Sequence, residues 1–321
     1  MALTKEQVAA FKRGFDLISD NIEKAVFGKK AEIRLVLAAM ISEGHVLLED
    51  FPGTGKTALA RALAETIRCE NKRIQFTPDL LPSDVTGMEI YNQKTQVFKF
   101  EPGPVFANIV LADEINRAGP KTQSALLQAM EEGKVNVGKV EYELPMPFLV
   151  IATQNPVEQE GVYPLPEAQL DRFMIKTSLG YPDVESTKLI LTGLVQSGGK
   201  LAPAVSSDDV RAMTKYAREV AISDELIEYI VKIVEQTRNS KRVEIGSSVR
   251  GARNLAKLAK TWALTDGRDY VVANDIKSLA VTVLAHRLKL NPELEENDGV
   301  KNETVMLEIL NSITPPKDPS K

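Results

Sequence analysis

The chain has 321 residues, a length that fits two domains of roughly 150 residues each. Lys and Arg number 40 against 44 Asp and Glu, so the net charge of −4 excludes a strong overall field that would recruit nucleic acid or anionic lipid. The hydrophobic share of 43% and the charged share of 26% are typical of a globular protein. The single cysteine, Cys69, excludes an internal disulfide or a CxxC metal site.

Targeting signals are missing from the sequence pattern. Residues 1–18 are charged throughout and lack the apolar stretch of a signal peptide. No run approaches the ~18 consecutive apolar residues of a membrane span. We therefore expect a cytoplasmic protein without a membrane-spanning helix.

The first 180 residues alternate short apolar runs with helical patterns. Such runs predict strands that are covered on both faces, and the alternation predicts a parallel five-stranded sheet with helices on its two sides, an α/β fold. The five predicted strands are HVLLED (45–50), RIQFT (73–77), NIVLAD (108–113), FLVIAT (148–153) and FMIKTSL (173–179).

After Gly180 the pattern changes to a helical period, and strand-like runs disappear. Four helices are predicted from this periodicity and from the Ser or Asn residues near their starts, at 206–220, 223–238, 248–264 and 274–288. We therefore expect residues 1–180 to form one domain and 181–312 a smaller all-helical domain, followed by a disordered tail, 313–321. Neither part is basic.

The segment after the first predicted strand contains Gly53-Thr54-Gly55-Lys56-Thr57 and opens an Ala/Leu-rich helix. Phosphates bind where glycines expose backbone N–H groups at a helix N-terminus, and Lys56 and Thr57 would supply a cation and a Mg²⁺ ligand. The pattern asks for glycine at the first position, where this chain has Asp50. A carboxylate there would repel phosphates unless its side chain faces away.

Two further strand ends carry polar residues suited to nucleotide chemistry. The strand at 108–113 ends in Asp113-Glu114, where Asp113 would hold Mg²⁺ and Glu114 would polarise an attacking water, which favours hydrolysis over phosphate transfer. Asn155 follows the strand at 148–153 and would orient that water or the γ-phosphate. Arg172 precedes the last predicted strand, either in a surface ion pair or as a finger that stabilises transition-state charge.

Three stretches resemble the MoxR family of AAA+ ATPases. They are DLLPSDVTG (79–87), GPVFANIVLADEINRAGPKTQSALLQAMEEG (103–133) and ATQNPVEQEGVYPLPEAQLDRF (152–173). The resemblance covers about residues 22–290 and implies an αβα P-loop core with a helical lid, ATP bound with Mg²⁺ between neighbouring subunits of a hexameric ring, and chaperone-like remodelling. It also implies a protein client and a partner with a von Willebrand factor A domain. No nucleic-acid partner is expected, because neither part of the chain is basic.

The resemblance also implies residue roles. Asp113 and Glu114 would be Walker B, Asn155 sensor 1, and Arg172 the finger that acts on a neighbour's ATP. Arg250 would be sensor 2 and would reach the same subunit's γ-phosphate, although an ordinary surface arginine is the alternative. Phe27 and Gly28 resemble the segment that contacts adenine, with core packing of Phe27 as the alternative. The Walker A contacts would come from Pro52, Gly53, Thr54, Gly55, Lys56, Thr57 and Ala58.

Two predicted hairpins, at 88–100 and 134–144, resemble the helix-2 insert and the pre-sensor-1 hairpin of this clade. We expect them to line the centre of the ring and move substrate; their alternative role is to stabilise loops. His45 and His286 have no metal-ligand spacing and are expected to be structural. The competing functions are a magnesium-chelatase-like or MCM-like motor subunit, a P-loop kinase and a non-hydrolysing scaffold, whereas no guanine-reading [NT]KxD motif supports a GTPase.

Overall fold

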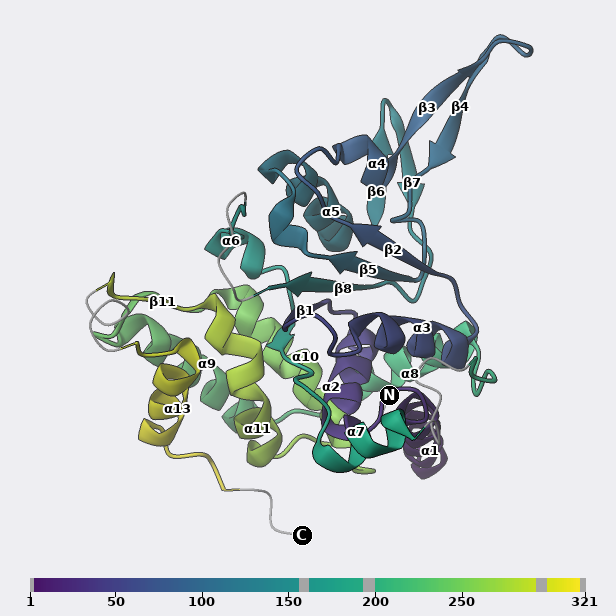
Figure 1. Cartoon of the computed structure of the whole chain (residues 1–321). Coiled ribbons are helices and arrows are strands. Elements are labelled where there is room, and N and C mark those ends of the chain that lie inside the picture. The colour runs from purple at the N-terminus through teal and green to yellow at the C-terminus, as the bar shows by residue number, and fades with distance from the viewer. Residues whose placement is uncertain (1–2, 156–161, 193–199, 293–298, 318–321) are drawn as a thin grey trace.

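The computed structural model describes residues 3–155, 162–192, 200–292 and 299–317. Its centre is a five-stranded, fully parallel sheet with the strand order β2-β5-β8-β1-β9 (Figure 1). All five predicted strands are confirmed. Their bounds are β1 (Val46–Glu49), β2 (Asn71–Gln75), β5 (Ile109–Asp113), β8 (Leu149–Gln154) and β9 (Ile175–Thr177).

Helices cover both faces of this sheet because successive strand residues point to opposite sides. Val46 and Leu48 pack into one cluster with α1 (Lys5–Glu23), α2 (Lys30–Ile41) and α3 (Lys56–Ile67). Leu47 packs into a second cluster with α4 (Pro82–Thr86) and α5 (Pro120–Glu132). A short turn of helix, η1 (Ile115–Arg117), follows β5, and α6 (Glu167–Leu170) precedes β9.

The helical part that follows packs directly on the first cluster, which runs without a break from the sheet into the lid helices. Three of its helices begin as predicted behind the capping side chains of Ser206, Ser223 and Ser248. Its elements are α7 (Val184–Leu191), α8 (Ser207–Glu219), α9 (Asp224–Asn239), α10 (Val249–Thr265), α11 (Ala273–Leu284), η2 (Ala285–Arg287) and α13 (Asn302–Ser312).

The expectation of an all-helical second part needs one correction. β10 (Val243–Ile245) and β11 (Lys289–Leu290) pair as a short antiparallel ribbon. Val243 and Leu290 are buried, so the ribbon closes the end of the lid core. Strands of three and two residues are too short to produce an alternating pattern, which is why the sequence does not reveal them. Of the predicted tail, residues 318–321 lie outside the described residues.

Both predicted hairpins are present. β3 (Gly87–Asn92) pairs with β4 (Val97–Pro102), and β6 (Lys134–Val137) pairs with β7 (Val140–Glu143). The β3–β4 ribbon projects from the body of the molecule beside the sheet (Figure 1). Its base is held by the stacked rings of Phe100 and Tyr142, whose centroids are 4.1 Å apart, so the two hairpins form one exposed feature. Within the described ranges, no helix is long and apolar enough to cross a bilayer.

Candidate functional site

A pocket of about 500 Å³ lies at the carboxyl ends of β1, β5 and β8. It contains residues from three separate sequence motifs, because the parallel strands that carry them end at the same edge of the sheet. Its lining includes Pro52, Gly53, Thr54, Gly55, Lys56, Thr57, Ala58, Asp113, Glu114 and Asn155. The structure therefore brings together the predicted loop, the predicted acidic pair and the predicted asparagine.

The glycines of the loop are needed for their backbone conformation. Gly53 and Gly55 have φ of +86° and +94°, a region that side-chain-bearing residues rarely adopt. A Cβ at either position would meet no heavy atom within 4 Å, so both glycines lie against open space. α3 begins at Lys56, immediately after Gly55, and its free N–H groups and dipole favour an anion at this end.

Asp50 lines the P-loop pocket, but its carboxylate is bonded to the backbone of another segment. Its carboxylate is buried, with 3% of the residue exposed, and accepts the backbone N–H groups of Leu179 and Gly180 at 2.7 and 2.8 Å. Two N–H donors stabilise a buried carboxylate that would otherwise be costly. The replacement of the first P-loop glycine is therefore a structural link from the loop to the segment that leads into the lid.

Asp113 is held from two sides at the end of β5. The Thr153 hydroxyl donates to Oδ1 at 2.6 Å, and the Arg73 guanidinium donates to Oδ2 at 2.6 Å. Asp113 is 8% exposed, so its carboxylate orientation is fixed by these contacts. The Thr57 hydroxyl and the Asp113 carboxylate supply the oxygen ligands that Mg²⁺ prefers. The donor set of this pocket thus fits magnesium.

Glu114 is held in an unusual backbone conformation with φ of +55°. Its N–H donates to Thr153 Oγ1 at 2.8 Å, which ties it to the neighbouring strand. Its Oε2 accepts from Gln75 Nε2 at 2.9 Å and from the Arg117 guanidinium at 3.0 Å. Left-handed backbone in a residue other than glycine is often found at functional sites. The carboxylate lines the pocket in a defined position.

Arg73 and Gln75 line the pocket and contact Asp113 and Glu114, although the sequence pattern did not predict them as site residues. Both lie on β2, an edge strand, and both line the pocket. The sequence analysis predicts this segment as an apolar strand covered on both faces, yet Ile74 is buried while Arg73 and Gln75 are exposed. This alternation of polar and apolar residues was the signal that could have found them.

The two predicted arginines lie together, outside the P-loop pocket. Arg172 Nε donates to Glu131 Oε2 at 2.9 Å, and the Arg250 guanidinium donates to Glu131 Oε1. Glu131 is near the end of α5, whereas Arg250 is on the first turn of α10 in the lid. Arg250 therefore does not reach the P-loop of its own chain here, as the resemblance implied, but shares one carboxylate with Arg172.

A buried ion pair supports this arginine cluster. The side chain of Arg287, 1% exposed, donates to Asp171 Oδ1 at 2.9 Å, and the Ser248 hydroxyl donates to the same oxygen at 2.9 Å. Burial lowers the pKa of Arg287 to about 10, although the neighbouring Asp171 opposes this change. Asp171 directly precedes Arg172, so Arg287 and Ser248 of the lid hold the chain next to the predicted arginine finger.

Phe27 and Gly28 lie beside the start of α7. Phe27 is half-buried, and Gly28 has φ of +67°, where a Cβ would lie 2.5 Å from the Ser186 hydroxyl. Neither residue lines the P-loop pocket. Their neighbourhood is nonetheless close to the loop, because the adjacent Lys29 donates to the Tyr181 carbonyl at 2.9 Å and Tyr181 stacks on Phe51 with ring centroids 6.2 Å apart.

The histidines are structural, as expected. His45 Nδ1 accepts the N–H of Val150 at 3.1 Å, and its Nε2 lies 3.0 Å from the Met130 carbonyl. Burial lowers the pKa of His45 to about 4. Burial and the adjacent Arg287 also hold the pKa of His286 well below its usual range. Both imidazoles are therefore neutral near pH 7.

Comparisons with known proteins agree with this geometry. Residues 45–175 match the ATPase family associated with various cellular activities (AAA), and residues 235–309 match the AAA lid domain. The chain is 49% identical to YeaC of Bacillus subtilis, with 92% of this chain and 93% of that protein covered.

Two further relatives extend the comparison. Chaperone MoxR1 of Mycobacterium tuberculosis is 38% identical, with 92% of this chain and 81% of that protein covered. A crystal structure of a candidate ATPase from Cytophaga hutchinsonii has 40% identity and a TM-score of 0.88, with 97% of this chain and 98% of that chain covered. Matches of this extent over both the core and the lid show that the chain belongs to the MoxR family of AAA+ ATPases.

Proposed function

We propose that this protein hydrolyses ATP and uses the reaction to remodel partner proteins. The observation that carries the proposal is the single pocket that joins the glycine loop, Asp113, Glu114 and Asn155. ATP is the nucleotide because the family is an ATPase family. Remodelling is the use we infer, since one relative is named a chaperone. We also place the activity in the cytoplasm.

Each pocket residue has a defined task in this mechanism. The backbone N–H groups of residues 53–57 and the Lys56 ammonium bind the β- and γ-phosphates. Thr57 and Asp113 would hold Mg²⁺, which would supply positive charge beside the same phosphates. Glu114 accepts a proton from the attacking water, and Asn155 positions that water. Gln75 and Arg117 keep the Glu114 carboxylate in place.

The arginines are proposed to act on a neighbouring subunit's ATP. Arg172 and Arg250 share Glu131 and do not line the P-loop pocket of their own chain. Two guanidiniums close together suit the charge that develops on a transferred phosphoryl group. We therefore propose that both, not Arg172 alone, complete the site of the adjoining protomer in a ring, most simply a hexamer.

The remaining proposed contacts are with the adenine, with a protein client and with a partner protein. Phe27 and Gly28 lie beside α7 and Tyr181, a position suited to the adenine end of the nucleotide. The joined hairpins carry exposed apolar side chains, including Ile90 at 50% and Phe98 at 63% exposed, which suit contact with a protein client. A protein with a von Willebrand factor A domain is the partner that we propose.

The test of hydrolysis is release of inorganic phosphate from ATP with Mg²⁺. Glu114→Gln should bind ATP with near-normal affinity and release phosphate at least about 100-fold more slowly, because the general base is lost. Retention of wild-type turnover by this variant would remove Glu114 from the mechanism. Phosphate appearing on an added acceptor instead of in solution would indicate transfer rather than hydrolysis.

The shared site is tested by protein concentration. Specific activity should rise with concentration and then saturate, since each active site needs residues from two protomers. Arg172→Ala should lose turnover but still bind nucleotide, and mixing it with Lys56→Ala should restore activity, because mixed interfaces combine an intact loop with an intact arginine. Turnover that is independent of concentration, with no rescue on mixing, would overturn the shared site.

A further inference from the structure

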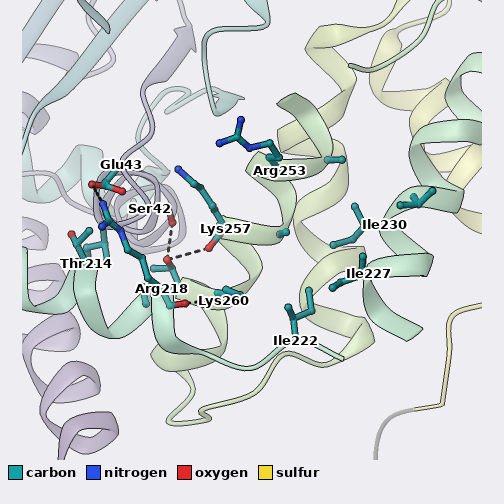
Figure 2. Close-up of a pocket in the computed structure, with 16 residues that line it drawn as sticks. Ser42, Glu43, Thr214, Arg218, Ile222, Ile227, Ile230, Arg253, Lys257 and Lys260 are labelled. Carbon is teal, nitrogen blue, oxygen red and sulfur yellow. Dashed lines mark hydrogen bonds and ion pairs between the residues drawn. The ribbon is translucent and has the colours of Figure 1, made fainter. Parts of the chain in front are cut away.

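A second hollow, of about 490 Å³, lies where the lid helices meet the end of a core helix (Figure 2). Its lining comes from α8, α9 and α10 of the lid and from residues 41–43 at the end of α2. Among the described residues, none lines both this hollow and the P-loop pocket. We refer to the hollow as the lid groove. Any molecule that fills it contacts the core and the lid at once.

One wall of the lid groove is apolar and open. Ile227, Ile230 and Val231 come from α9 at a spacing that places them on one face of the helix. Ile227 and Val231 are each 44% exposed, and apolar side chains exposed next to one another are typical of a binding surface. Ala252 and Ala256 line the groove from α10, where their small side chains allow an occupant to approach closely. An apolar occupant would therefore be stabilised here.

The rim of the lid groove is basic. Arg253, Lys257 and Lys260 follow one another at helical spacing along α10 (Figure 2). Arg253 and Lys257 are exposed, and neither forms an ion pair with any residue that the structure describes. The acidic residue at this rim, Glu43, is already paired with Arg218. Negative charge on an occupant would therefore be attracted to this rim.

The shape of the groove favours a helix as its occupant. From residue 253 to residue 260, the cations of α10 extend over about 10 Å, or about two helical turns. An extended peptide would leave its backbone N–H and C=O groups unpaired here, because the described lining comes from helices and adjoining turns, not from a strand edge. A helix pairs these groups internally and can carry apolar residues on one face with charged residues beside them.

The charge of the groove favours another protein over a second copy of this chain. On α1, α7 and α13, an acid beside an exposed apolar residue is already held in an ion pair. These pairs are Asp16–Arg34 beside Leu17, Glu185–Lys188 beside Val184 and Glu308–Arg242 beside Leu307. A second copy that used one of these faces would have to break the pair before its acid could reach the rim.

We propose that the lid groove binds an amphipathic helix of a partner protein, with apolar residues on one face and acidic residues along its edge. The apolar face packs on Ile227 and Val231, and the acidic residues lie along Arg253 and Lys257. The inference goes beyond the proposed function and does not depend on hydrolysis, because binding itself is what it predicts.

The docked helix would lie next to the arginine cluster. Glu43 and Lys257 of the lid groove also line the adjoining pocket, which contains Arg172 and Arg250. Because the groove is built from both parts of the chain, its occupant would hold the lid against the end of α2. A partner bound there is therefore placed to influence the position of both arginines.

Selection of helical peptides on the whole chain tests the proposal. The displayed peptides have about 16 residues, a length at which isolated helices become stable, and are randomised along one face. The groove variants are Val231→Asp and Lys257→Glu. Their matched controls are Leu307→Asp, at a 50% exposed position of α13, and Lys232→Glu, on α9, whose lysine pairs with Glu228 and does not line the groove. A thermal melt verifies folding, and Val231→Ser replaces Val231→Asp if the latter is unfolded.

Selected peptides should carry apolar residues at helical spacing with Asp or Glu beside them. Their dissociation constants, measured by fluorescence anisotropy, should rise at least about tenfold with either groove variant and stay within about twofold with either control. Lys257→Glu should also bind a peptide with Lys in place of Glu more tightly than wild type does. Selected peptides without acidic residues, binding that survives both groove variants, or a selection without binders would overturn the proposal.

Sedimentation velocity distinguishes the partner helix from a second copy of the chain. With a non-hydrolysable ATP analogue and Mg²⁺, wild type, both groove variants and both controls should sediment alike. If the groove variants lose an assembly that wild type and the controls form, a second copy fills the groove, and the proposal of a partner helix is wrong.

Discussion

Substitution of Asp50 tests whether the first position of the P-loop serves the fold or the nucleotide. Its carboxylate accepts two backbone N–H groups, from Leu179 and Gly180, at 2.7 and 2.8 Å, and the residue is 3% exposed. Asp50→Ala leaves both donors buried without an acceptor. Each such donor costs about 1–3 kcal/mol, so the free energy of unfolding should fall by about 2–6 kcal/mol.

Asp50→Asn should be milder, because the amide oxygen can still accept one N–H group. The other N–H then faces an amide donor, and the expected loss is about 1.5–3 kcal/mol. Glu49→Gln is the matched control: Glu49 is the adjacent carboxylate and pairs with Lys176 at 2.9 Å, with both side chains partly exposed. An ion pair of that kind is worth about 0–1 kcal/mol.

The assay is urea unfolding followed by the fluorescence of Trp262, the single tryptophan, which packs against the main apolar cluster. ADP binding is measured in parallel. The predicted order of stability is wild type, Glu49→Gln, Asp50→Asn, Asp50→Ala. If Asp50→Ala instead keeps the wild-type midpoint and binds ADP more tightly, the carboxylate faces the phosphates, and the structural reasoning is refuted.

Three further predictions concern groups around the site. Protonation of His45 should destabilise the fold in acid, because its pKa is about 4 in the folded state and near 6.5 in the unfolded state. Up to about 3 kcal/mol of the free energy of unfolding at pH 7 should be lost as the pH falls from about 6.5 to 4. If the urea midpoint of His45→Gln has the same pH dependence as that of wild type, this prediction is wrong. Asp171→Leu should lower the free energy of unfolding by about 3–5 kcal/mol, because it leaves the buried Arg287 without its ion-pair partner. The double variant with Arg287→Met should recover part of that loss in the same unfolding assay. Additive losses would show that the pair is not coupled. Gln75→Leu should lower turnover about tenfold with ADP affinity nearly unchanged, since Glu114 loses one of its two side-chain donors, and equal turnover would remove Gln75 from the site.

The sheet and the nucleotide loop were predictable because their signals are local. Each strand is a short apolar run, and the loop is a contiguous set of residues whose glycines need positive φ. Asp113, Glu114 and Asn155 could be assigned to the same pocket because parallel strands deliver their carboxyl ends to one edge of the sheet. The lid ribbon escaped prediction because pairing between residues far apart, not local pattern, creates it.

The partners of the charged residues were not predictable for the same reason. Glu131 meets Arg172 and Arg250 across 41 and 119 positions of sequence, and Asp50 meets residues 179 and 180 across about 130. The P-loop sequence pattern alone suggests that Asp50, in place of glycine, would weaken phosphate binding. Tertiary structure removes the conflict by turning the carboxylate toward the lid-side segment, where two N–H groups need an acceptor.

Core and lid therefore meet in polar contacts at two places, one beside the phosphate-binding loop and one beside Arg172. Asp50 ties the phosphate-binding loop to Gly180, whose φ of +63° is a conformation open to glycine, at the entrance to the lid. Asp171, next to Arg172, is held by Ser248 and Arg287 of the lid. Loss of the Asp50 or the Asp171 carboxylate would leave buried polar groups without a partner, which is costly. In the proposed mechanism, the lid would therefore be coupled to the nucleotide of its own chain through Asp50 and to that of a neighbouring protomer through Arg172 and Arg250.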